Sequence, residues 1–188
     1  MAFRAVLEKV LPDKHAVQGS ELYDKINGAY LTCPRSGRFD RETEIQPGRP
    51  RTPLAIKGTG HTSFAGAANV QDGITIASQG LKGLRLCEDK GQIAIGVGET
   101  WGSVYTELEK HGLTVPGGRV GRVDVPGLIL GGGMSFYSTK HGFACDSVLD
   151  LEVVLASGEI IHANAKQNSD LFVCLKGGLN NFGVVASI

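Results

Sequence analysis

The six residues 57–62, Lys-Gly-Thr-Gly-His-Thr, combine a nucleophilic side chain with an open main chain. Gly58 and Gly60 stand at alternate positions, so consecutive N–H groups can turn toward one point and form a nest for phosphate oxygens. His61 adds an imidazole, which in its neutral form is a good nucleophile near pH 7. The segment predicts phosphate binding beside a reactive histidine, and a simple glycine turn is the alternative.

Two further glycine clusters follow. Residues 116–134 include three consecutive glycines at 131–133, which leave ~10 Å of main chain without side chains at ~3.3 Å per residue. That strip makes room for a flat or elongated ligand, and a loose connecting loop is the alternative. Residues 175–185 form the third cluster. A P-loop motif is missing from the sequence, and residues 96–102 depart from the G-x-G-x-x-G spacing by one residue, so neither of these nucleotide sites is predicted.

Short apolar runs between glycine turns should position these clusters as loops between strands. Residues 101–108 carry an apolar stripe at helical spacing, with Thr100 as the cap and Gly112 at the stop. A final helix should run from Asn168, with Asp170 in its first turn, to the glycines at 177–178. The predicted strands are 54–56, 74–76, 81–86, 93–97, 148–156, 160–163 and 183–188, and those at 148–156 and 160–163 should form a hairpin through Ser157-Gly158-Glu159.

The N-terminal part has a different character. Residues 1–32 are predicted to be helical with a break at Pro12. Residues 33–52 carry eight charged residues and three prolines with only two large apolar side chains, so we expect a mobile loop there.

Composition limits the classes of function. With 188 residues and 41% hydrophobic residues, the chain should form one domain. The 19 basic and 19 acidic residues balance, so neither a nucleic-acid partner nor an acidic membrane surface is expected. Without an apolar stretch of ~18 residues or the hydrophobic core of a signal peptide, we expect a cytoplasmic or other intracellular location. The four cysteines are widely spaced and predict ordinary thiols, with neither a metal site nor a disulfide.

Three runs together carry a family resemblance: residues 53–69 (PLAIKGTGHTSFAGAAN), 127–146 (GLILGGGMSFYSTKHGFACD) and 168–185 (NSDLFVCLKGGLNNFGVV). In order and spacing they resemble the signature blocks of the PCMH-type FAD-binding domain shared by p-cresol methylhydroxylase, vanillyl-alcohol oxidase and berberine-bridge-like enzymes. The resemblance implies an α+β fold of two small α/β subdomains. It also implies that FAD binds in an extended form, with its pyrophosphate on the first block.

The resemblance further implies where the cofactor lies. In this family the histidine of the first block commonly bonds to the flavin 8α carbon, and His61 stands at that position. Some members add a second bond through a cysteine, but Val120 stands there in this chain, so one bond is expected. The residues placed around FAD are Lys57, Gly58, Thr59, Gly60, His61, Thr62, Val120, Gly127, Gly131, Gly132, Gly133, Gly142, Asp146 and Val184.

Three other roles stay open. Asp146 is predicted to accept a hydrogen bond from a ribose or from the main chain, and structuring of its own loop is the alternative. Tyr137 and His141 are candidates to border the flavin ring, and a surface position is the alternative. The sequence assigns no catalytic base.

The chain also departs from the family pattern. Residues 1–52 lack the strand and helix that the family places before the first block, so the first FAD subdomain is expected to be incomplete. Members of this family continue into a substrate domain, after which a terminal segment returns to the FAD-binding domain. Neither follows residues 53–188, so we expect the substrate domain to be absent and the FAD-binding domain to be incomplete at its C-terminus. Specificity and proton abstraction lie in that missing part, and fold analogy cannot supply them.

Three functions remain in view. The first is an oxidoreductase or oxidase that acts on small organic substrates with covalently linked FAD. The second is a catalytically inert FAD-binding module that needs a missing domain. The third is a reductase of the UDP-N-acetylenolpyruvylglucosamine type, which the glycine triplet and the block around His61 disfavour.

Overall fold

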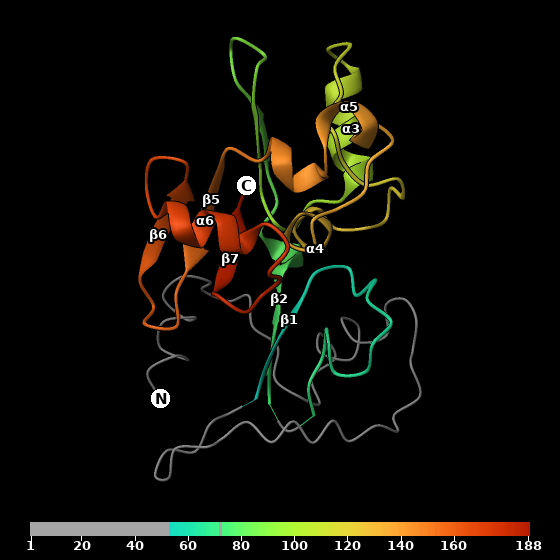
Figure 1. The fold of residues 1–188 in the computed structure, drawn as a ribbon. Helices are drawn as coiled ribbons and strands as arrows, with labels where there is room; N and C mark the ends of the chain where they lie inside the picture. The colour runs from blue at the N-terminus through green and yellow to red at the C-terminus, as the bar shows by residue number, and fades with distance from the viewer. Residues whose placement is uncertain (1–52, 72) are drawn as a thin grey trace.

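The computed structural model describes residues 53–71 and 73–188, which mix short strands with short helices (Figure 1). The described part agrees with the α+β class. The helical segment expected over 1–32, the charged loop expected over 33–52 and Cys33 all lie outside the described residues. Within the described part, none of the helices is both long and apolar enough to cross a bilayer.

The first pair of strands is parallel. β1 (Leu54–Lys57) lies beside β2 (Ile74–Ala77), in a register that places Leu54 opposite Ile74. A 3₁₀ turn, η1 (Ser78–Gly80), follows β2 directly. The buried Ser78 hydroxyl lies 3.3 Å from the Lys57 carbonyl and donates to it, so the end of β1 is attached to the turn after β2. This arrangement fixes the point at which residues 58–62 leave the sheet.

The second sheet is antiparallel. Its three-stranded part has the order β6-β5-β7, and β7 also pairs with the end of β4 through two main-chain hydrogen bonds between Ile95 and Ile188, of 2.7 and 2.9 Å. Main-chain bonding therefore runs through five strands in the order β6-β5-β7-β4-β3. These strands are β3 (Leu84–Leu86), β4 (Ile93–Ile95), β5 (Asp150–Val154), β6 (Ile160–Asn164) and β7 (Val184–Ser187).

The strand prediction was correct in position, but four of the seven strands are shorter than predicted and the other three are one residue longer. The predicted strand 81–86 begins only at Leu84, because Gly83 adopts φ +150° and gives its N–H to the Glu99 carboxylate at 3.0 Å instead of to a strand. Leu149 lies inside the predicted strand 148–156, but it precedes β5 and is 58% exposed. The hairpin of β5 and β6 is confirmed, with Val154 opposite Ile160.

Helix α3 (Trp101–Glu109) matches the prediction closely. The Thr100 hydroxyl accepts a hydrogen bond from the Ser103 N–H, and the Ser103 hydroxyl accepts one from the Thr100 N–H, which completes a capping box. Glu99 is buried beside this cap and accepts hydrogen bonds from the Gly83 N–H and, at 2.6 Å, from the Ser103 hydroxyl. The carboxylate thus connects the β3 side of the sheet to the start of α3.

Helix α6 (Ser169–Leu175) begins one residue after its predicted start, and Asn168 occupies the N-cap position. Asn168 adopts a left-handed conformation with φ 49°, and its side chain makes no capping bond. Its amide instead donates to the His162 carbonyl at 2.7 Å. The side chain therefore joins the helix to β6, where it cannot satisfy the first turn of α6.

Two short helices lie in the segment that the sequence presented as glycine-rich loops. Helix α4 (Val125–Leu130) is capped by the Asp124 carboxylate, and Pro126 lies in its first turn, where the missing N–H costs nothing. Helix α5 (Ser138–His141) and the 3₁₀ turn η2 (Ala144–Ser147) follow.

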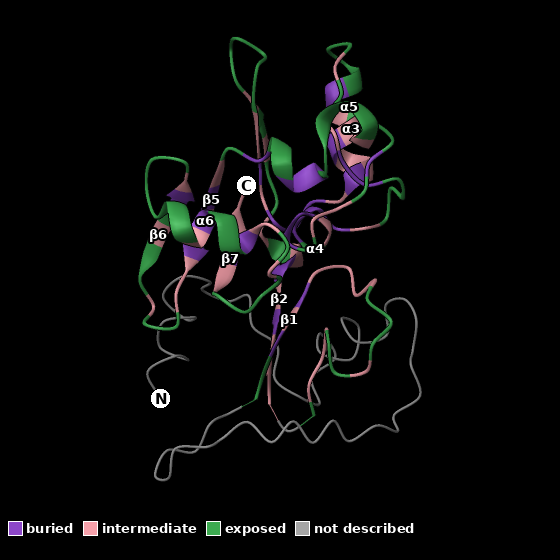
Figure 2. Ribbon diagram, in the orientation of Figure 1, coloured by how far each residue is buried: buried purple, intermediate pink, exposed green. Residues whose placement is uncertain are grey.

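The core lies between the antiparallel sheet and helices α3, α4 and α6 (Figure 2). At its centre Trp101 is 1% exposed, and the indole N–H has no hydrogen-bond partner among the described residues. The main chain of Gly117 and Gly118 lies directly on the indole, so that a Cβ at either position would fall onto ring atoms. The other large side chains that are almost completely buried are Val97, Val104, Leu108, Val125, Leu151, Val153 and Leu175.

Candidate functional site

The loop of residues 58–62 leaves the end of β1 beside a buried cation. Lys57 is 4% exposed, and burial lowers the pKa of its ammonium group below the ordinary lysine value. Gly60 adopts φ +75°, a conformation that favours glycine. Among residues 53–71 and 73–188, no group accepts a hydrogen bond from the N–H of Gly60 or Thr62. These two donors flank His61 and are available to an anionic ligand.

One carboxylate links this loop to the second glycine cluster. Asp124 is 8% exposed, and its Oδ1 accepts hydrogen bonds from the Thr59 hydroxyl at 2.7 Å and from the Thr59 N–H at 3.2 Å. Its Oδ2 accepts the Gly127 N–H at 3.0 Å, which caps α4. The structure thereby brings Gly58, Thr59 and Gly127, three of the predicted site residues, around one side chain.

Gly58 shows how closely the two segments approach. A Cβ at Gly58 would lie on the carboxylate of Asp124, so any larger residue there would displace the link. The Gly58 carbonyl also accepts a hydrogen bond from the Gln79 side-chain amide at 3.0 Å. Loop 58–62 is therefore attached at its base on two sides, by η1 and by the start of α4.

The glycine triplet joins the end of α4 to the turn η2 within the same block, residues 127–146. The carbonyl groups of Gly132 and Gly133 accept hydrogen bonds from the N–H groups of Cys145 at 2.9 Å and Ala144 at 2.7 Å. Both glycines have positive φ, of +89° and +80°. A Cβ at Gly132 would meet nothing within 4 Å, whereas one at Gly131 would lie 3.3 Å from the Gly127 carbonyl oxygen and one at Gly133 would lie 2.9 Å from the Leu128 side chain, so of the three glycines Gly132 alone borders open space.

The loop after α5 is held by a hydrogen bond between its own residues. Gly142 adopts φ +74°, and the Asp146 carboxylate accepts the Phe143 N–H at 2.8 Å. Of the roles considered for Asp146, the structure displays the main-chain bond that organises its own loop. Cys145 beside it is buried, and burial raises the pKa of its thiol above the ordinary value.

The third block meets the same short helix at its other end. The Leu179 N–H donates to the Leu130 carbonyl at 3.0 Å, and the Leu179 side chain lies near Gly131. Helix α4 thus contacts the first block at its N-terminus and the third block at its C-terminus.

Four predicted residues lie elsewhere. Val120 is half-exposed on the turn before α4, and Val184 lies in β7 opposite Val154. Tyr137 and His141, at the two ends of α5, are both exposed, which is the surface position considered for them. None of these placements assigns a contact with a ligand.

Sequence reasoning missed Asp124 and Gln79. A signal for Asp124 was present, because an aspartate two residues before a proline is typical of a helix N-terminus. Gln79 carried no such signal, since its role depends only on the packing of η1 under loop 58–62.

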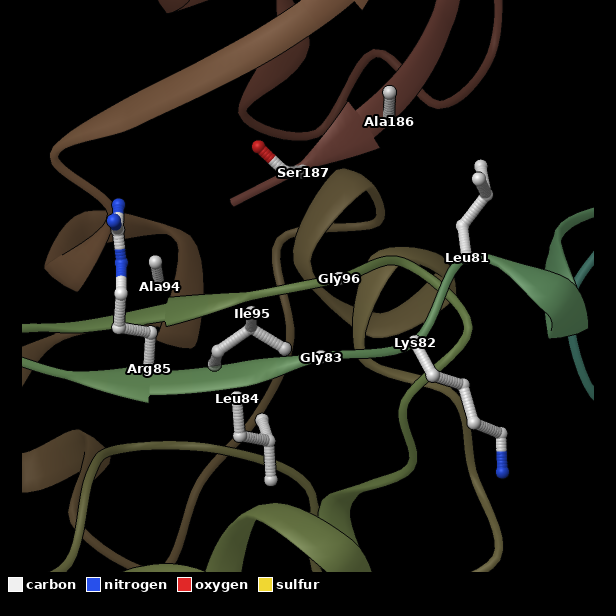
Figure 3. A pocket seen from close by; sticks show the side chains of 10 residues that line it. All are labelled: Leu81, Lys82, Gly83, Leu84, Arg85, Ala94, Ile95, Gly96, Ala186 and Ser187. Atoms are coloured by element: carbon white, nitrogen blue, oxygen red, sulfur yellow. The ribbon is translucent and has the colours of Figure 1, made fainter. Parts of the chain in front are cut away.

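A groove lies away from these loops, between the β3–β4 hairpin and β7 (Figure 3). Its lining includes Lys82, Arg85 and Ser187, and Figure 3 shows the Lys82 and Arg85 side chains directed to opposite sides. Because the two cations do not converge, the groove has no feature of an anion site.

The β5–β6 hairpin carries a second polar cluster on its exposed surface. His162 Nδ1 lies 2.6 Å from Asp150 Oδ2, and the Asn164 amide donates to the other oxygen of that carboxylate at 2.7 Å. The hydrogen bond and charge of Asp150 raise the pKa of His162 above its ordinary value of 6.5. No side chain of loop 58–62 takes part in this cluster.

Comparison with known proteins agrees with this geometry. The family model of the FAD binding domain matches residues 48–164, more than half of the chain. The FAD-dependent monooxygenase tpcD of Cochliobolus heterostrophus is 48% identical over 133 residues, which cover 71% of this chain and 26% of that protein. The chain thus spans about a quarter of the length of the curated relatives that it matches.

Solved structures give the same result. The 6-hydroxy-D-nicotine oxidase of Arthrobacter nicotinovorans superposes with a TM-score of 0.69 at 29% identity, over 72% of this chain and 30% of that one. A VAO-type flavoprotein of Myceliophthora thermophila C1 gives a TM-score of 0.68 at 30% identity, over 72% and 26%. The chain therefore belongs to the FAD-binding domain family of the vanillyl-alcohol oxidase and berberine-bridge-like flavoproteins.

Proposed function

We propose that residues 53–188 form the FAD-binding portion of a flavin-dependent oxidoreductase and that FAD is bonded covalently to His61. The observation that carries this proposal is the loop around His61: two N–H donors that have no acceptor among the described residues flank this histidine, on a loop attached at its base to η1 and α4. Related proteins named as a monooxygenase and as an oxidase support the reaction class.

The described residues fit FAD. The N–H groups of Gly60 and Thr62 supply donors for the pyrophosphate, and the main chain at Gly132 borders open space that the elongated part of the cofactor could use. FAD, when bound, accepts hydride from an organic substrate and passes the electrons to oxygen or another acceptor. The contribution of this chain is to bind the cofactor, orient it and present the imidazole at its ring end.

The covalent step balances without a further protein group. A bond forms between an imidazole nitrogen of His61 and the flavin 8α carbon, while one hydrogen leaves that carbon and one leaves the imidazole. The two hydrogens and their electrons reduce the flavin by two electrons. Dioxygen then oxidises it again and is itself reduced to hydrogen peroxide.

We place substrate recognition and the catalytic base outside this chain, in the remaining length of the full-size relatives. The substrate is proposed to be a small organic molecule. That the chain spans only about a quarter of those relatives also favours a second candidate, an FAD-binding module without turnover of its own. Substrate oxidation by the isolated 188-residue chain would exclude this second candidate, and it would also contradict the placement of the catalytic base outside the chain.

The proposal is tested by incubating the purified chain with FAD and following flavin through acid precipitation and denaturing electrophoresis. We expect yellow, fluorescent protein whose mass has increased by one FAD. His61→Ala should lose the covalent fraction and keep reversible FAD binding.

The matched control is His111→Ala, which removes an exposed histidine near the end of α3, 3.9 Å from Glu107. It should keep the full covalent yield. An unchanged covalent yield in His61→Ala would remove His61 from the assignment, and a chain that binds no flavin in any form would refute the whole proposal.

A further inference from the structure

We propose that Asp124 is a positioning residue for the attachment of FAD to His61. It acts through Thr59, which lies two residues before the histidine, and it never contacts the reacting atoms itself. This inference rests on the proposed function, because it concerns the rate at which the bond described above is formed.

The link between Asp124 and Thr59 consists of three hydrogen bonds across 65 residues of sequence. The Thr59 hydroxyl donates to Asp124 Oδ1 at 2.7 Å and accepts the Asp124 N–H at 3.3 Å, while the Thr59 N–H donates to the same Oδ1 at 3.2 Å. Side chain and main chain of both residues are thus engaged with each other. With one partner 8% exposed, little water competes for these bonds.

The same carboxylate is fixed from its other side. Oδ2 accepts the Gly127 N–H at 3.0 Å, so the rotation of the carboxylate is set by the first turn of α4. The Asp124 main chain also bridges to Thr100, just before α3. The orientation that Asp124 gives to Thr59 is therefore determined by the folded core, not by the loop.

The chain between Thr59 and His61 cannot supply this orientation. Gly60 is the only residue between them, and glycine has the widest conformational freedom of any residue. Phe64 further along the loop is 77% exposed, so that side adds little packing. Without the Asp124–Thr59 link, we expect His61 to sample several positions relative to the 8α carbon. A misplacement of about 1 Å slows a bond-forming step by as much as about 100-fold.

A competing explanation is that Asp124 only stabilises α4 as its N-cap. Asp124→Ser separates the two roles, because a serine hydroxyl can accept the Gly127 N–H and cap the helix. Its shorter side chain places the hydroxyl too far away to replace Oδ1 at Thr59.

Thr59→Val tests the link from the other partner. It removes the hydroxyl and two of the three bonds while retaining the size and branching of the side chain. Thr59→Ser retains the hydroxyl. Thr75→Val is the matched control: it removes a threonine hydroxyl bonded at 2.7 Å to Asn69, in the same β1–β2 unit and away from Asp124.

The measurement is the rate of covalent FAD incorporation at saturating FAD, by the 188-residue chain, with the Kd for FAD and the Tm determined for each variant. We expect Asp124→Ser and Thr59→Val to incorporate FAD about 10- to 100-fold more slowly, with Kd changed less than the rate. Thr59→Ser should recover the rate, and Thr75→Val should keep it.

Equal rates in wild type, Asp124→Ser and Thr59→Val would overturn the inference and leave the assignment of His61 intact. A loss of rate that only parallels a loss of FAD affinity or of Tm would also overturn it, because that is the signature of a structural cap. Should Asp124→Ser fold poorly, Thr59→Val with its serine counterpart decides the matter. No covalent FAD in wild type would instead refute the proposed attachment, and the inference with it.

Discussion

The buried indole of Trp101 allows a prediction in which one replacement destabilises the fold strongly and another scarcely changes its stability. Trp101→Ala removes a side chain that is 1% exposed and packed on Gly117 and Gly118, and it should cost about 3–5 kcal/mol in the free energy of unfolding. Trp101→Phe removes three ring atoms, of which two are carbons worth about 1.6 kcal/mol at ~0.8 kcal/mol for each buried group. It also removes an N–H that has no partner among the described residues, and burial of such a donor costs about 1–3 kcal/mol.

The two contributions of the Trp101→Phe change oppose each other, so we expect a net change in the free energy of unfolding that lies between a gain of about 1.4 kcal/mol and a loss of about 0.6 kcal/mol. Urea denaturation followed by far-UV circular dichroism measures it, since the chain has one tryptophan and the variants lose its fluorescence. A loss of more than about 3 kcal/mol in Trp101→Phe, as large as in Trp101→Ala, would show that the indole N–H makes a stabilising bond and that the reasoning is wrong.

Three further outcomes follow from buried and charged groups. Because Asp150 raises the pKa of His162 in the folded chain, protonated His162 stabilises the fold at pH values below its ordinary pKa of 6.5, and this stabilisation is lost as pH rises through the raised pKa. The Tm should therefore fall over that pH range, and His162→Gln should make the Tm less dependent on pH. The buried Cys145 thiol, whose pKa is raised, should react with a disulfide reagent more slowly than the exposed Cys87, and equal rates by peptide mapping would contradict this. Glu99→Gln leaves one oxygen for two donors and should cost about 1–3 kcal/mol by urea denaturation, whereas an unchanged midpoint would show that the amide suffices.

The elements that could be predicted from the sequence are those with a local cause. Helix α3 was recognisable because its apolar stripe, the cap at Thr100 and the stop at Gly112 all lie within one short segment. The β5–β6 hairpin was recognisable because alternating apolar residues flank the turn at Ser157 and Gly158. In both, pattern and propensity favour the same structure, so no distant contact is needed to decide it.

Helix α4 was not predictable in that way. Its residues 125–130 include Pro126 and Gly127, which favour a loop when read locally. The helix forms because Asp124 caps it and because Val125 and Ile129 are buried in the core. The unusual conformation of Asn168 has a similar origin, since its side chain is engaged by β6.

The loops of the candidate site could be predicted from the sequence, but the hydrogen bonds that connect these loops to one another could not. The glycine spacing and the family resemblance indicated the segment around His61, but the link from Thr59 to Asp124 spans 65 residues and has no local pattern. The Gly58 position was recognised as permissive for main-chain conformation. The structure adds a second reason for glycine there, because the carboxylate occupies the volume that a Cβ would need.

The placement of β7 between β5 and β4 has a consequence for how the chain acquires its structure during synthesis. The β5–β6 hairpin can form as soon as it leaves the ribosome. Ile95, by contrast, pairs with Ile188, which is synthesised about ninety residues later, and pairing between such distant residues slows folding. Until then the β4 edge is an unpaired strand, open to other nascent chains.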